Sequence, residues 1–140
     1  MAIPSFTPTY GYPRFSTLTF PTVTPATETT AAAVTFTVTQ VMGGFILRDP
    51  NGAGRADLLP TAAAIVAALE GVAVGSSFYF DIRNTADAAE TITITTNTGL
   101  TLSGTMTIAQ NAGKRFLVRV TNATAGSEAV TVYSLGAYTF

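Results

Sequence analysis

Residues 91–104, TITITTNTGLTLSG, contain two short alternations of a polar with an aliphatic residue, separated by Asn97-Thr98-Gly99. Alternation with a period of two is typical of a β-strand with one buried face, and a break containing Asn and Gly predicts a turn. Threonine suits the outer face because its branched Cβ favours extended backbone and its hydroxyl is hydrated without charge. The stretch holds no acid, base, thiol or imidazole, so it predicts scaffold and not a reactive site.

The segments around this stretch continue the β pattern. Strands are predicted over residues 33–39, 43–49, 76–84, 105–110, 114–120 and 129–136, separated by segments rich in turn residues. In the first of these strands Val34, Phe36 and Val38 are expected to face inward and the intervening threonines outward. Short strands at such regular spacing indicate a mainly β chain, an antiparallel β-sandwich or a small barrel.

One short helix is predicted over residues 60–71, PTAAAIVAALEG. Pro60 or Thr61 opens it, the alanines favour it, and Gly71 closes it. Ile65 and Leu69 are four residues apart, so they share one helical face and are expected to anchor the helix to a sheet.

The composition changes near residue 30, which divides the chain into an arm, residues 1–32, and a β-sandwich-like domain, residues 33–140. Five prolines lie in the first of these segments, and each fixes φ and removes a backbone donor, so an extended arm is expected. The arm also carries five aromatic residues: Phe6, Tyr10, Tyr12, Phe15 and Phe20. A free linker would not expose them, so they are expected to pack either on their own domain or on a partner.

The charge content argues against several classes of partner. Charged residues make up 11% of the chain and the formal net charge is −1, so nucleic acid is not expected as a partner. Basic residues cluster only at Lys114, Arg115 and Arg119, and Arg115 and Arg119 share one strand face, which is expected to be solvated. The chain has no cysteine and no histidine, so disulfides, thiolate chemistry and histidine-based catalysis are excluded.

The sequence also bears on location. Residues 1–15 do not read as a secretory signal, and the longest apolar stretch, residues 58–75, is interrupted by Pro60, Glu70 and Gly71. No membrane association is expected, and the protein is expected in the cytoplasm or in a particle assembled there.

No grouping of reactive side chains indicates an enzyme, a metal site or a cofactor. Asp49, Asn51 and Asp57 offer spaced oxygen donors in a loop over residues 49–60, but their pattern does not match a calcium-binding loop. Asp87 and Glu90 flank another loop, yet their spacing singles out no catalytic pair. We therefore expect no catalytic residue and no metal ligand.

A second apolar surface is predicted on the strands. Tyr79, Leu117, Tyr133 and Leu135 fall opposite the inward-facing residues of their segments. Such residues form either a subunit interface or part of a two-layer core.

The amino-acid sequences of four segments resemble those of a known family. They are GGFILRDPNGAGRADLLPTAAAIVAALEG (43–71), VGSSFYFDIRNTADAAETITI (74–94), GTMTIAQNAGKRFLVRVTN (104–122) and GSEAVTVYSLG (126–136). Over Gln40 to Gly136 the chain resembles the head decoration, or cement, proteins of tailed bacteriophages, whose modules also occur in phage fibres and spikes. The resemblance implies a β-sandwich-like domain that forms a homotrimer on the outer surface of the head, at junctions between capsomers. It implies no enzyme activity, and it does not extend to residues 1–32.

Together these observations predict a structural virion protein. Its expected partners are the major capsid protein and further copies of itself, its expected role is to stabilise the shell, and the aromatic arm is expected to contact the capsid. The alternative is a fibre or spike head module that binds a host receptor.

Overall fold

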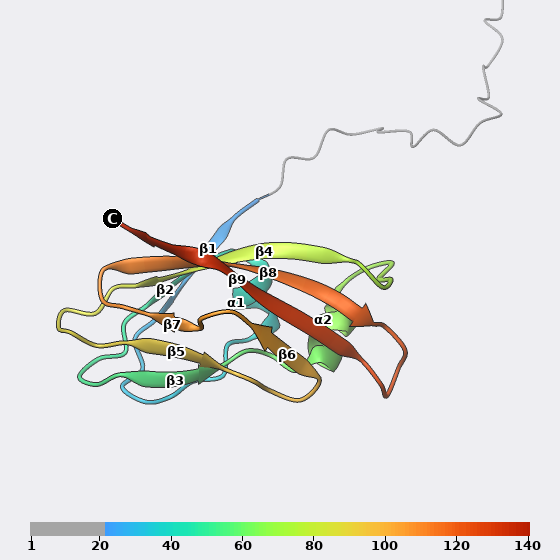
Figure 1. Cartoon of the computed structure of the whole chain (residues 1–140), viewed down its shortest axis with the longest axis horizontal. Helices are drawn as coiled ribbons and strands as arrows, with labels where there is room; N and C mark the ends of the chain where they lie inside the picture. The colour runs from blue at the N-terminus through green and yellow to red at the C-terminus, as the bar shows by residue number, and fades with distance from the viewer. Residues whose placement is uncertain (1–21) are drawn as a thin grey trace, which may run out of the picture.

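The computed structural model describes residues 22–140, and it is mainly β, as predicted (Figure 1). The strands form a six-stranded sheet in the order β1-β2-β4-β8-β9-β6 and a three-stranded sheet in the order β3-β5-β7. The elements are β1 (Thr24–Glu28), α1 (Val38–Met42), β2 (Gly44–Arg48), β3 (Arg55–Leu58), α2 (Ala62–Ala68), β4 (Ser77–Asn84), β5 (Ile92–Thr95), β6 (Leu100–Ser103), β7 (Thr107–Ile108), β8 (Ala112–Asn122) and β9 (Ala129–Thr139). The arrangement is sandwich-like, and the described strands close no barrel.

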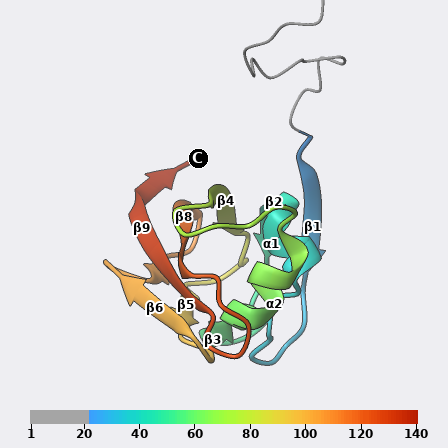
Figure 2. The same ribbon diagram turned by 90° about the vertical axis from the view of Figure 1, so that its right-hand side faces the viewer.

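The core lies between the two sheets. Figure 1 shows the small sheet below the large one, and Figure 2 shows both helices on the same side of the molecule as β1. From the large sheet, Phe80 and Phe116 stack with their ring centroids 5.1 Å apart and are fully buried. From the small sheet, Ile92 and Ile108 are also fully buried. Burial of such side chains stabilises the fold by about 1.5–3 kcal/mol each before ordering costs.

The stretch over residues 91–104 crosses from one sheet to the other. Its first alternation is β5 in the small sheet, and its second is β6 at the edge of the large sheet. At the crossing, the Asn97 side-chain amide donates a hydrogen bond to the carbonyl of Leu59, 2.9 Å away. Gly99 has φ +77°, and a Cβ there would lie 2.6 Å from the Cβ of Ala62, so only glycine fits. The predicted turn therefore links two layers instead of two paired strands.

The sheets are mixed, which corrects the prediction of an antiparallel sandwich. β1 pairs with β2, β2 with β4, β3 with β5 and β6 with β9 in parallel, while β4, β8 and β9 are antiparallel. Parallel neighbours need a crossover connection. α1 supplies one between β1 and β2, and the passage through β3 and α2 supplies another between β2 and β4. β3 itself lies inside the loop predicted over residues 49–60.

The predicted strand over residues 33–39 is wrong in its backbone but right in its burial. Phe36 is buried and Val34 and Val38 are half-buried, while the intervening threonines are exposed. Thr35 forms only an isolated bridge to Leu58, and a second helix, α1, begins after Thr37. Thr37 and Gln40 form a capping box, in which each side chain accepts a hydrogen bond from the backbone N–H of the other.

The helix predicted over residues 60–71 is present as α2. Thr61 caps its N-terminus and accepts a hydrogen bond from the backbone N–H of Ala64, at 3.2 Å. Ile65 is buried, as predicted, and Leu69 packs against the core. However, the helix ends at Ala68, before the predicted Gly71, so Leu69 is an extended C-cap residue and does not share a helical face with Ile65.

A fully buried ion pair joins the two sheets. Arg48, at the end of β2, places its Nε 2.8 Å from Oδ2 of Asp57 on β3, and neither side chain is exposed. Its Nη2 also reaches Oδ1 of Asp57, and its remaining N–H groups donate to the carbonyls of Thr30, Ala32 and Asp49. All five donors of the guanidinium are therefore satisfied.

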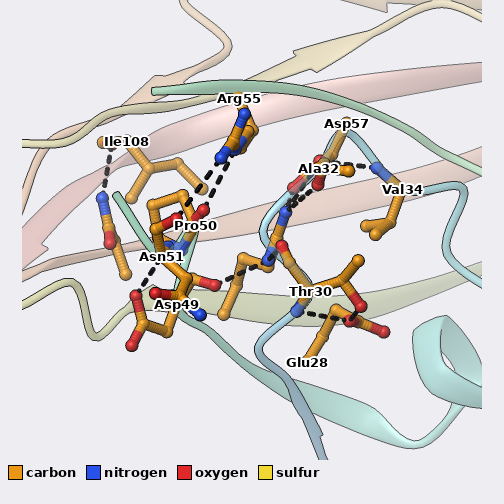
Figure 3. A network of polar contacts seen from close by, with 12 residues as sticks. Glu28, Thr30, Ala32, Val34, Asp49, Pro50, Asn51, Arg55, Asp57 and Ile108 are labelled. Atoms are coloured by element: carbon orange, nitrogen blue, oxygen red, sulfur yellow. Dashed lines mark hydrogen bonds and ion pairs between the residues drawn. The ribbon is translucent and has the colours of Figure 1, made fainter. Parts of the chain in front are cut away.

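The same network holds the segment that follows β1 against the core through hydrogen bonds. Figure 3 shows Glu28, Thr30, Ala32 and Val34 gathered on one side of Asp57. The backbone N–H of Val34 donates to Oδ1 of Asp57 at 3.0 Å, and that of Thr30 donates to Oε1 of Glu28 at 3.0 Å. Hydrogen bonds from Thr30 lower the pKa of the Glu28 carboxyl. Residues 22–32, which the sequence assigns to the arm, thus include an edge strand and part of this network.

We expect Asp57→Asn to lower the free energy of unfolding by about 3–5 kcal/mol, because it leaves the Arg48 charge buried without its counter-ion. The matched control is Asp81→Asn, which breaks the partly exposed pair with Arg115 and should cost at most about 1 kcal/mol. Urea denaturation of the two variants measures the difference. Equal losses would show that the buried pair has no special part in stability.

Candidate functional site

The outer face of the large sheet carries a row of apolar side chains. Tyr79 on β4, Leu117 on β8 and Tyr133 on β9 lie directly opposite one another in the strand register. Residues directly opposite on one face of a sheet contact each other. Tyr79 is 58% exposed, and Leu117 and Tyr133 are half-buried. We call this face, with Leu135, the outer row.

An ion pair lies next to the outer row. Asp81 and Arg115 are opposite one another, with Arg115 Nη2 3.0 Å from Asp81 Oδ2 and its Nε 3.2 Å from both carboxylate oxygens. Hydrogen bonding to Asp81 raises the pKa of the Arg115 guanidinium above its ordinary value. Because the Arg115 side chain is 59% exposed, the pair contributes little to stability. It instead marks a polar border on an apolar face.

Aromatic residues at the end of the chain extend this face beyond the ion pair. Tyr138 lies over Gly113, where a Cβ would come within 2.3 Å of the tyrosine Cζ. Burial raises the pKa of the Tyr138 hydroxyl. The ring of Phe140 covers Arg83, whose Cζ lies 3.2 Å from the ring centroid in a cation–π contact. Both aromatic side chains remain more than 40% exposed.

The strand register places three of the four predicted interface residues directly opposite one another. The fourth, Leu135, is 51% exposed and lies on β9 where the pairing with β8 shifts between Lys114 and Phe116. This shift changes which side of β9 faces outward, so the sequence pattern missed Tyr138. A glycine within a strand indicates such an irregularity, and Gly136, with φ +112°, was the available signal.

The arm aromatics cannot be placed in the same way. Phe6, Tyr10, Tyr12, Phe15 and Phe20 all lie outside the described residues. Their roles remain predictions.

The acidic residues considered for chemistry do not converge. Asp57 is bound to Arg48 in the core, and Asp49 accepts a hydrogen bond from the backbone N–H of Asn51, 2.9 Å away in its own loop. Over residues 22–140, no three Asp, Glu, His or Cys side chains are grouped closely enough to hold a metal ion.

Lys114, the only lysine of the chain, is buried on the inner side of β8. Its Nζ donates to the carbonyl of Thr105 at 2.5 Å. Burial lowers the pKa of the ammonium group, because the charged form loses hydration. The amine is therefore part of the core and is not available to a partner on the outer face.

No protein-family model, curated protein or solved structure matches this chain. Among residues 22–140, none of the helices has the length and apolar character needed to span a bilayer.

The lowered pKa of Lys114 predicts a pH dependence of stability. Between that pKa and the ordinary lysine value of 10.5, the unfolded chain binds more protons than the folded one, so the free energy of unfolding rises with pH. We expect Lys114→Met to abolish this rise. Urea unfolding of the wild type and of the variant, from pH 7 to the ordinary lysine pKa of 10.5, tests this expectation. Titration of the tyrosines affects both proteins equally, so it cancels when the two free energies of unfolding are subtracted. Parallel pH profiles for the two proteins would contradict the assignment.

Proposed function

We propose that this chain is a structural virion protein of a tailed bacteriophage. It forms a homotrimer that decorates the outer surface of the head at capsomer junctions, binds the major capsid protein and stabilises the shell. The observation that carries the proposal is the outer row, an apolar surface across three strands that is only partly covered within residues 22–140.

The composition of the outer face supports a contact between copies. Protein interfaces combine aromatic residues at the centre with a polar rim. Tyr79, Leu117 and Tyr133 supply such a centre, and the ion pair of Asp81 with Arg115 supplies a polar border. Large exposed apolar residues that share one face mark an interaction site more often than isolated ones do.

The composition of the arm supports attachment to a shell. Its prolines restrict the free chain, so less conformational entropy is lost when it binds. A trimer presents three arms, so binding by one raises the effective concentration of the others. A net charge of −1 also allows many copies to sit side by side without strong repulsion.

The alternative, a receptor-binding fibre or spike module, has less support. Its binding loops would be expected to carry aromatic residues. The exposed loops over residues 85–89 and 123–128 contain none.

We expect the wild-type protein to be a trimer and the double variant Tyr79→Ser with Leu135→Ser to be a monomer at micromolar concentration. Truncation of an interface hot spot costs about 2 kcal/mol, or about 30-fold in affinity. The matched control is Val74→Ser, which changes a 63% exposed residue away from the outer row. Light scattering on a sizing column measures the mass. A wild-type monomer, or a trimeric double variant, would contradict the assigned interface.

Removal of residues 1–21 should leave a folded trimer that no longer binds heads. The truncation stops there because β1 and the carbonyl of Thr30 belong to the domain. The control keeps the length of the arm and replaces Phe6, Tyr10, Tyr12 and Phe15 by serine, which should also abolish binding. Sedimentation with purified heads measures binding, and heat-induced release of DNA measures stabilisation. Decoration by the truncated protein, or undecorated heads of equal heat resistance, would overturn the proposal.

A further inference from the structure

A shallow apolar hollow lies at the point where the described chain begins. Its volume is about 350 Å³. The lining residues are Thr24 of β1, three residues of α1 with the glycine that follows it (Val38, Thr39, Met42 and Gly43), and Ala68 at the end of α2. Met42 is 39% exposed, although most large apolar residues of the domain are buried. A methionine side chain adapts its shape to a neighbour and makes favourable contacts with aromatic rings.

The start of the described chain is fixed beside this hollow. The backbone N–H of Thr24 donates to the carbonyl of Gly43 at 2.7 Å, which joins β1 to the end of α1. The side chain of Val23 lies against Gly44. The chain therefore enters the domain along the wall of the hollow.

Phe20 lies four residues before Thr24. Four residues span at most about 14 Å, so the Cα of Phe20 stays within that distance of a residue that lines the hollow.

We propose that the hollow binds the side chain of Phe20 from the same chain. The short connection gives this ring a higher effective concentration at the hollow than the ring of any free neighbouring copy. Only Pro21, Thr22 and Val23 separate Phe20 from Thr24, and the ring of Pro21 restricts its φ angle.

The inference does not depend on the proposed function, and it gives Phe20 a role different from that of the other four arm aromatics. Phe20 anchors the root of the arm to its own domain. Phe6, Tyr10, Tyr12 and Phe15 remain available to a partner. Binding of Phe20 in the hollow fixes the direction in which the arm leaves the domain.

The chain contains no tryptophan, so a single tryptophan reports on this site in the isolated protein. The emission of Phe20→Trp should be blue-shifted relative to that of Phe15→Trp. Adding Ala68→Arg, which places a charge in the hollow, should shift the emission of Phe20→Trp back to the red. Ala67→Arg is the matched control, because Ala67 is exposed on the same helix but does not line the hollow, and it should leave the emission unchanged.

The absence of cysteine allows a second test that identifies which chain supplies the ring. Phe20→Cys with Met42→Cys, treated with a short bismaleimide, should give cross-linked single chains, and Phe15→Cys with Met42→Cys should react more slowly. Equal emission of the two tryptophan variants, no effect of Ala68→Arg, or cross-links between two chains would overturn the proposal. None of these measurements involves heads, so their failure is distinguishable from failure to decorate.

Discussion

The buried ion pair between Arg48 and Asp57 constrains the two-layer arrangement, because neither charge has water around it and each must keep the other as its partner. It connects β2 of the large sheet to β3 of the small one, and the same guanidinium holds the carbonyls of Thr30 and Ala32. Separating the sheets, or detaching the segment after β1, would leave a charge in the core without its partners. In a chain with few charged residues, this one pair therefore connects the edge segment of the domain to its core.

Local signals predicted the elements better than their pairing. The period-two alternation identified β4 to β9, and the alanine-rich segment identified α2, because each pattern depends on nearby residues. The spacing of Thr37 and Gln40 also matches a capping box, but the alternation around Phe36 favours a strand over the same residues. The crossing at Asn97 to Gly99 depends on Leu59 and Ala62, which are distant in sequence, so no local pattern distinguishes it from a hairpin.

The candidate surface was predictable to the point where β9 loses its regular alternation. The alternation of side chains along each strand predicts that Tyr79, Leu117 and Tyr133 face outward, and the strand register aligns them in one row. Tyr138 does not follow from parity, because the irregularity between β8 and β9 precedes it. The partly exposed hollow at the end of α1 could not be predicted either, because its walls come from three elements that meet only in the folded chain.

The direction of β1 bears on how the domain would respond to mechanical load. β1 is an edge strand that runs parallel to β2, and the arm continues from its first residues. A pull on the arm along the axis of β1 loads the hydrogen bonds of that strand together, in shear, instead of opening them one at a time. The hydrogen bond from the Arg48 guanidinium to the carbonyl of Thr30, just beyond the other end of β1, resists the same displacement. Tension transmitted through the arm would therefore be opposed first by the hydrogen bonds of β1.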